Sequence, residues 1–256
     1  MQPVVLKTKY AFHLLVSFLR PQVILDIGSM DGADSKRFAR LVPGAQTVAF
    51  EGNPDNYRAM CADVELAAMS IRLENALVSD VPGSTSFFVQ KPEADMTGFN
   101  RGTSSTRQRS LEGASTEEVV LDAVRIDEFV TGEYPNVSRA AAWVDVEGHS
   151  YGVLKSMDGV AGKIKLIHAE VETEEIWPEQ KLEKEVLMLA ESMGFVLLAR
   201  GPGKVQRDVI LANNLWYEQN RKVIQRILSV ARLIGPAASR IVESRGWQSI
   251  FGRQSP

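Results

Sequence analysis

The sequence is poor in cysteine and histidine: its 256 residues include one cysteine, Cys61, and three histidines. One thiol cannot form an internal disulfide, and nothing else indicates an oxidising compartment, so we expect a cytoplasmic protein. Long apolar runs are also missing. The early run at 11–19 is too short to span a bilayer and is not followed by a cleavage-site pattern, which argues against secretion and against membrane spanning.

The composition is that of an ordinary globular chain, with 45% hydrophobic and 24% charged residues. Its length is sufficient for one large domain with its own core. The net charge of -3 is unevenly distributed: residues 216–256 carry seven basic and two acidic side chains, a charge of +5, so the rest of the chain carries -8. An acidic body of this kind offers no broad basic track for a phosphate backbone, which argues against general nucleic-acid binding.

The hydrophobic pattern alternates strands and helices. A β-branched run at 23–27 ends in Gly28, helical spacing follows at 33–41, and a second short strand at 47–50 precedes Asn53 and Pro54, which are typical of a helix start. Further strands are predicted at 71–78, 85–89, 119–126, 141–146 and 164–171, then a helix at 179–192 and a hairpin from 195–199 and 208–212. The pattern predicts an α/β fold with a largely parallel sheet closed by an antiparallel hairpin.

The sequence divides into a domain at 1–215 and an extension at 216–256. The domain begins with a helix within 1–20, and residues 91–118 lose all periodicity, which favours a lid loop. The extension is predicted to be basic, amphipathic and helical, because Val223, Ile227, Val230 and Leu233 recur at helical spacing. We expect it to pack on its own domain, on a partner, or on the anionic inner face of a membrane.

The turn after the first strand is a candidate ligand site. Gly28 and Gly32 allow a ligand to approach bare backbone at the carboxyl end of the strand. The spacing does not match the G-x-G-x-x-G dinucleotide fingerprint, and neither Gly-Lys pair has the hydroxyl and the strand-to-helix setting of a phosphate loop. Glu51 ends the second strand, where a carboxylate can accept hydrogen bonds from both hydroxyls of a ribose. The pair of features predicts a nucleoside-type ligand.

Four acids follow two neighbouring predicted strands. Asp145 and Glu147 are two residues apart, so both project to the same side of a strand end, and Glu170 and Glu172 repeat the pattern on the next strand. Such carboxylates can bind a divalent cation such as Mg²⁺ or hold a substrate hydroxyl. The alternative is that some of them cap helices.

The histidines provide candidates for a general base. His13 lies on the N-terminal apolar helix and is predicted to be packed. His149 follows the Asp-Val-Glu-Gly turn and His168 lies within the strand that ends in Glu170. An imidazole near its ordinary pKa can remove a hydroxyl proton, so both are candidates.

Four stretches of the sequence resemble the FkbM family of methyltransferases that depend on S-adenosylmethionine (SAM). They are 25–32 (Leu-Asp-Ile-Gly-Ser-Met-Asp-Gly), 49–57, 124–129 and 144–148 (Val-Asp-Val-Glu-Gly). The resemblance covers roughly residues 20–175. It implies a Rossmann-like class I methyltransferase fold, with a mostly parallel seven-stranded sheet closed by an antiparallel hairpin and helices on both faces.

The resemblance also implies roles for individual residues. Asp26, Gly28, Ser29 and Gly32 would line the methionine and ribose side of SAM, and Glu51 would hold the ribose hydroxyls. Asn75 would lie beside the adenine, or would serve only as a turn residue at a strand end. The family's Glu-Pro-Asn-Pro is Glu-Gly-Asn-Pro here, so Gly52 departs from the pattern.

The resemblance implies O-methylation of a hydroxyl on a small-molecule or glycan acceptor. One alternative is a non-catalytic subunit that binds SAM or a nucleoside. Another is a nucleic-acid methyltransferase, which is disfavoured by the acidic body and because Asp-Val-Glu-Gly stands where methyltransferases of base amino groups have a motif of the Asp-Pro-Pro-Tyr type.

Overall fold

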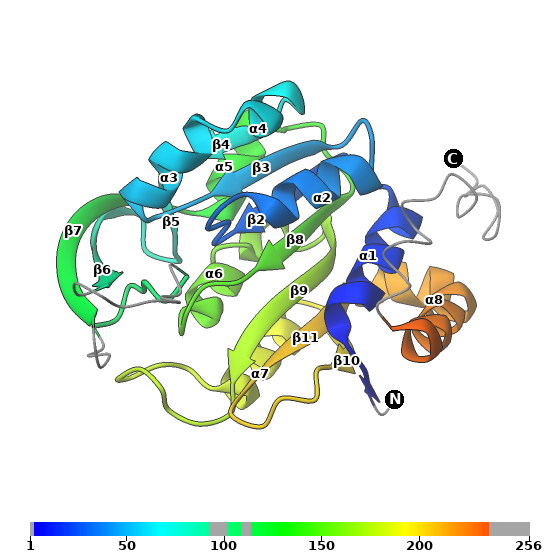
Figure 1. Ribbon diagram of the computed structural model, residues 1–256. Helices are drawn as coiled ribbons and strands as arrows, with labels where there is room; N and C mark the ends of the chain where they lie inside the picture. The colour runs from blue at the N-terminus through cyan, green and yellow to red at the C-terminus, as the bar shows by residue number, and fades with distance from the viewer. Residues whose placement is uncertain (1–2, 93–101, 109–113, 236–256) are drawn as a thin grey trace.

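The computed structural model describes residues 3–92, 102–108 and 114–235. Its main sheet has eight strands in the order β1-β10-β11-β9-β8-β2-β3-β4 (Figure 1). In that order the strands are Val4–Val5, Phe195–Arg200, Gln206–Asn213, Ile164–Glu172, Ala140–Val144, Val23–Ile27, Gln46–Phe50 and Arg72–Glu74. Strand β11 is antiparallel to both of its neighbours, and the other pairings are parallel. The predicted Rossmann-like sheet closed by a hairpin is confirmed, with the two-residue β1 added at its edge.

Helices cover both faces of this sheet because its strands are apolar on both sides. In β2, Ile24 packs with α1 (Thr8–Leu19), α2 (Ala33–Leu41) and α8 (Asn214–Ile234). The next residue, Leu25, packs on the opposite face with α5 (Ile126–Glu133), α6 (Ser150–Lys155) and α7 (Glu183–Ser192). Side chains alternate along a strand, so the burial of consecutive residues identifies β2 as a central strand. The short helices α3 (Pro54–Cys61), α4 (Val64–Ala68) and η1 (Asp158–Val160) complete the fold.

A second, three-stranded sheet lies beside the end of the first. It consists of β5 (Leu77–Val78), β7 (Ala114–Val124) and β6 (Gly83–Pro92), in that order across the sheet. The single strand expected at 71–78 is therefore wrong: the chain leaves the main sheet at Asn75, whose side-chain amide donates to the Glu51 carbonyl at 2.8 Å. The strands expected at 85–89 and 119–126 exist, but they pair with each other and bury their own apolar cluster, which includes Leu77 and Phe87.

This hairpin shortens the irregular stretch expected at 91–118. Strand β6 continues to Pro92 and β7 begins at Ala114. Between them the structure describes residues 102–108, and one of these, Ser105, forms a β-bridge with Phe88. The remaining residues of the predicted lid loop lie outside the described part of the chain.

Helix α8 belongs to the core of the domain. Trp216, Ile224, Ile227 and Leu228 are buried, and the helix packs against α1. The first part of the predicted extension, α8, therefore packs on the domain, and residues 236–256 lie outside the described ranges. No helix within residues 3–92, 102–108 and 114–235 is both long and apolar enough to span a bilayer.

Candidate functional site

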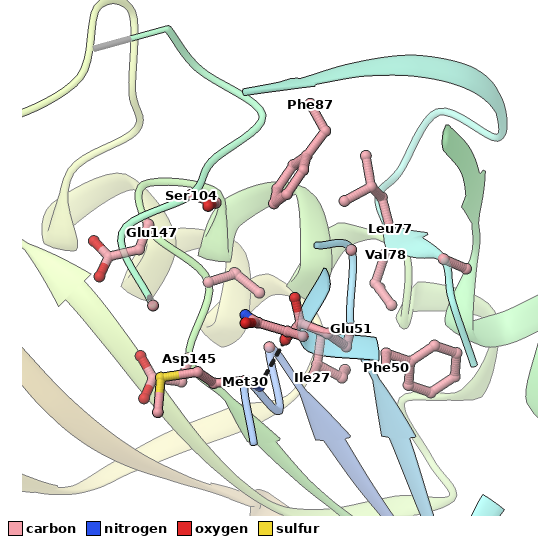
Figure 2. Close-up of a pocket in the computed structure, with 16 residues that line it drawn as sticks. Ile27, Met30, Phe50, Glu51, Leu77, Val78, Phe87, Ser104, Asp145 and Glu147 are labelled. Carbon is pink, nitrogen blue, oxygen red and sulfur yellow. Dashed lines mark hydrogen bonds between the residues drawn. The ribbon is translucent and has the colours of Figure 1, made fainter. Parts of the chain in front are cut away.

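A cavity opens at the carboxyl ends of β2, β3 and β8. Its walls come from the turns after these strands, from the second sheet and from the segment 102–108. The lining residues are Ile27, Gly28, Met30, Phe50, Glu51, Gly52, Asn56, Ala76, Leu77, Val78, Phe87, Gly102, Ser104, Asp145, Val146 and Glu147 (Figure 2). The cavity thus joins the predicted glycine turn, Glu51 and the first pair of acids in one site.

The glycine turn contributes backbone to the cavity and is fixed from beneath. The amides of Gly28 and Ser29 both donate to the Phe50 carbonyl at 3.0 Å, and the Ser29 hydroxyl donates to the Asp26 carbonyl at 2.9 Å. Gly28 has φ +87° and Gly32 has φ +71°, values that favour glycine. Only Gly28 of these two lines the cavity, because Gly32 packs against the Leu66 side chain.

Asp26 lies behind the turn rather than in the cavity. Its side chain is 1% exposed and Oδ2 accepts from the Ser35 hydroxyl at 2.5 Å. Burial raises the pKa of Asp26 to about 7, and the hydrogen bond from Ser35 opposes the shift. Asp26, Ser29 and Gly32 do not line the cavity and support the turn that Gly28 presents, so their contact with a ligand stays a prediction.

Glu51 lines the cavity with a carboxylate held by backbone amides. Oε2 accepts from Met30 N at 2.6 Å and Oε1 accepts from Asn53 N at 2.7 Å. Burial raises the pKa of Glu51 to about 7, and the two amides partly oppose this shift because they stabilise the ionised form. A carboxylate with both oxygens fixed in this way is pre-oriented to accept hydrogen bonds from a ligand.

The second sheet supplies an apolar wall next to Glu51. A β-carbon on Gly52 would lie 2.5 Å from Leu77 Cδ2 and 3.3 Å from the Phe87 ring, so glycine at this position lets both side chains close on the cavity. Asn75 does not line the cavity. Its side-chain amide donates to the Glu51 carbonyl just after β3, as expected if Asn75 serves as a turn residue at a strand end. The sequence did not identify Phe87 as a site residue, because the pattern at 85–89 predicts a strand and nothing about the cavity beside it.

Asp145 and Glu147 form another part of the wall. Figure 2 shows Ser104 and Glu147 on one side of the cavity and Leu77 and Val78 on the opposite side. Asp145 is an exposed residue of this turn. Partial desolvation, together with the nearby Asp208 carboxylate, raises the pKa of Asp145 to about 6, and a side-chain hydrogen bond with Glu170 opposes the shift.

The carboxyl groups of Glu170 and Glu172 are both held by contacts within the protein, and Glu170 shares a side-chain hydrogen bond with Asp145. Glu170 Oε2 accepts from the Gln206 side chain at 2.6 Å, and burial together with the Asp145 charge raises the pKa of Glu170 to about 9. Glu172 is 2% exposed and accepts from Gly148 N at 3.3 Å, and burial raises its pKa to about 7. Within the described residues no group of three or more His, Cys, Asp or Glu is arranged to hold a metal ion. The four-carboxylate cation site is therefore not formed.

The two candidate histidines also lie outside the cavity lining. His168 is 2% exposed, stacks on Trp143 with ring centroids 3.7 Å apart, and has Nε2 3.2 Å from Thr8 Oγ1. Burial holds its pKa well below the ordinary value, so the prediction of His168 as a general base is wrong. His149 has Nε2 3.1 Å from Ser79 Oγ, and burial lowers its pKa. The prediction that His13 is packed is confirmed.

Comparisons with known proteins add the following similarities. Residues 26–197 match the model of the methyltransferase FkbM domain. The 2-O-methyltransferase NoeI of Sinorhizobium fredii (strain NBRC 101917 / NGR234) is 29% identical over 197 residues, which cover 75% of this chain and 79% of NoeI. 

Two solved structures are also similar. The N-terminal domain of EvdMO1, crystallised in the presence of SAH and D-fucose, is 14% identical with a TM-score of 0.43, over 81% of this chain and 83% of that one. The bifunctional kinase-methyltransferase WbdD is 15% identical with a TM-score of 0.45, over 81% of this chain. This chain spans 38% of the WbdD chain and 40% of the chain in a second EvdMO1 structure.

Proposed function

Since the chain belongs to the FkbM family of methyltransferases, we propose that it transfers the methyl group of SAM to a hydroxyl oxygen of a small-molecule or glycan acceptor. The observation that carries this proposal is the single cavity that joins Gly28 and Glu51 to Asp145 and Glu147. The likeness to NoeI, named a 2-O-methyltransferase, supports a hydroxyl as the acceptor group.

The residues present fit SAM. Gly28 and Gly52 leave room that a β-carbon would fill, the Glu51 carboxylate suits the two ribose hydroxyls, and Leu77 with Phe87 gives a flat ring an apolar wall. When bound, SAM supplies an electrophilic methyl group on a sulfonium. The protein must therefore hold the acceptor oxygen in line with that methyl group and accept a proton, without any covalent intermediate.

Asp145 is the best-placed proton acceptor. It lines the cavity, and a carboxyl group with a pKa near 6 is largely ionised at neutral pH while remaining basic enough to take a proton during transfer. Glu147 is placed to orient the acceptor through a further hydrogen bond. We prefer Asp145 to His149 as the base because the imidazole lies outside the cavity lining and its Nε2 contacts Ser79.

The test uses labelled SAM with separate pools of sugars, lipid-linked glycans and RNA. We expect transfer to a sugar or glycan, as a methyl ether that survives mild alkali, whereas a methyl ester would be hydrolysed. Label in RNA would support the nucleic-acid alternative. SAM binding by calorimetry without transfer to any pool would support the non-catalytic alternative.

A further inference from the structure

Residues Gly102–Gln108, here called the strap, line part of the cavity and are joined to β6 by an isolated β-bridge. The Phe88 amide donates to the Ser105 carbonyl at 2.8 Å, and the Ser105 amide donates to the Phe88 carbonyl at 3.2 Å. Gly102 and Ser104 face the cavity, whereas Ser105 is 4% exposed. The strap is thus fixed to β6 at Ser105, with alternate residues available to the site.

The Ser105 hydroxyl joins the strap to the turn after β8. It donates to the Glu147 carbonyl at 2.6 Å and accepts from the Arg107 amide at 3.1 Å. Both its hydrogen and one lone pair are therefore used. This oxygen therefore links the strap to the turn 145–148, which carries the two acids of the cavity wall.

Other contacts hold the remaining residues of this turn. Asp145 N donates to the Ile27 carbonyl at 2.9 Å, and Gly148 packs so closely on Trp177 that a β-carbon would lie 2.8 Å from the indole. Glu147 lies between these anchors and receives the contact from Ser105. Without it, the carbonyl of Glu147 loses a short hydrogen bond.

The strap is also attached on each side of Ser105. Ser104 Oγ accepts from the Gln90 amide at 3.1 Å, and Arg107 Nη1 donates to the Pro178 carbonyl at 2.6 Å. Neither reaches the turn 145–148. Loss of the Ser105 hydroxyl therefore removes the hydrogen bond between the strap and the Glu147 carbonyl while leaving these two attachments in place.

We propose that Ser105 is a positioning residue for methyl transfer, whose hydroxyl fixes the turn carrying Asp145 and Glu147 against the cofactor side of the cavity. This rests on the proposed function. In-line transfer tolerates little misalignment, and a displacement of about 1 Å can cost about 100-fold in rate. Gly28 and Glu51 are held by contacts that do not involve the strap, so the cofactor side should be unaffected.

The test compares Ser105→Ala with Thr106→Ala. Thr106 is a matched control because its Oγ1 is buried next to Ser105 but makes no hydrogen bond in the described structure. For Ser105→Ala we expect kcat to fall about 10- to 100-fold, with the Kd for SAM within about threefold of wild type. Amide hydrogen exchange of peptides covering 145–149 should become faster. Thr106→Ala should match wild type in all three measurements.

Wild-type kcat and wild-type exchange in a folded Ser105→Ala protein would overturn the proposal, as would equal effects of both variants. If Ser105→Ala does not fold, Ser105→Cys keeps a similar volume with a weaker donor, and its kcat should still fall while SAM binding is retained. Hydrogen exchange needs no acceptor. A wild-type protein that transfers no methyl group would therefore contradict the proposed function, while unchanged exchange in Ser105→Ala would contradict the role of Ser105.

Discussion

Gly28 and Asp145 touch backbone to backbone: a β-carbon on residue 28 would stand 1.9 Å from the Asp145 carbonyl oxygen. The glycine turn after β2 and the acidic turn after β8 are therefore packed directly on each other. The side of the cavity assigned to the cofactor and the side assigned to the acceptor meet at this contact, which the hydrogen bond from Asp145 N to the Ile27 carbonyl also holds.

Gly28→Ala is expected to disrupt the fold and the cofactor site together. The new methyl group meets a backbone carbonyl, and φ +87° is unfavourable for alanine, so we expect a loss of about 3 kcal/mol or more in the free energy of unfolding. Gly44→Ala is the control: φ is +96°, but no atom lies within 4 Å of the added carbon, so the cost should be about 1 kcal/mol. Thermal unfolding and SAM calorimetry measure both. Similar melting temperatures for the two variants would contradict the proposed clash.

Glu51 should make SAM affinity depend on pH. Burial raises its pKa from 4.5 to about 7 in the free protein, so below pH 7 the carboxyl is mostly protonated, whereas ribose hydroxyls donate best to the ionised form. Affinity should therefore rise about tenfold between pH 6 and pH 8. The rise should be largely lost in Glu51→Gln, which should also bind SAM more weakly by about 1.5 to 3 kcal/mol. Calorimetry at both pH values checks this, and equal pH dependence in the two proteins would remove Glu51 from the ribose site.

Asp145→Asn should abolish most turnover while leaving SAM bound. The amide keeps the shape but cannot accept the proton, so we expect kcat to fall about 100-fold or more. Single-turnover assays with an identified acceptor measure this, and a wild-type rate in the variant would refute the assignment.

Chelation of divalent cations should not affect transfer. Glu170 has its pKa raised to about 9 by burial and the nearby Asp145 charge, and Glu172 accepts from the Gly148 amide, so neither offers a free carboxylate next to Asp145. We expect activity in EDTA within twofold of the untreated enzyme. A loss that Mg²⁺ restores would show that the acids rearrange around a cation during the reaction.

Helix α8 should contribute to stability through one face only. Ile227 is 0% exposed against α1, whereas Leu233 on the same helix is 85% exposed. Ile227→Ala should lower the free energy of unfolding by about 2 to 5 kcal/mol, and Leu233→Ala by less than about 0.5 kcal/mol. Denaturant titration of the full chain compares them. Equal effects would mean that the exposed face is also covered.

The basic extension at 216–256 also leads to a prediction about binding to anionic membranes. Each basic residue near an anionic surface adds about 1 kcal/mol of attraction. If residues 216–256 contact lipid, the protein should float with anionic vesicles at low salt but not with neutral ones. Failure to float with anionic vesicles would leave packing on the domain as the role of α8.

Local pattern was sufficient for the features that depend on short stretches of chain. The apolar run at 23–27 that ends in Gly28 predicted both β2 and the turn, because strand and glycine preferences are properties of neighbouring residues. The Asn53-Pro54 pair likewise predicted the start of α3. The site residues Gly28, Glu51, Asp145 and Glu147 follow from the same logic, because the carboxyl ends of parallel strands meet at one edge of a sheet.

What only the tertiary structure decided was which polar side chains face the cavity and which are used inside the protein. Asp26 and His168 are residues of types that often take part in catalysis. In this fold both are buried: Asp26 accepts a hydrogen bond from Ser35, and His168 stacks on the Trp143 ring. Phe87 and Ser105 belong to segments whose sequence indicated a strand and a loop, and they reach the site only because β6 and β7 leave the main sheet and pair beside it. Sequence periodicity specifies the face of an element that is buried, whereas the partner across that face is set by contacts between residues far apart in the chain.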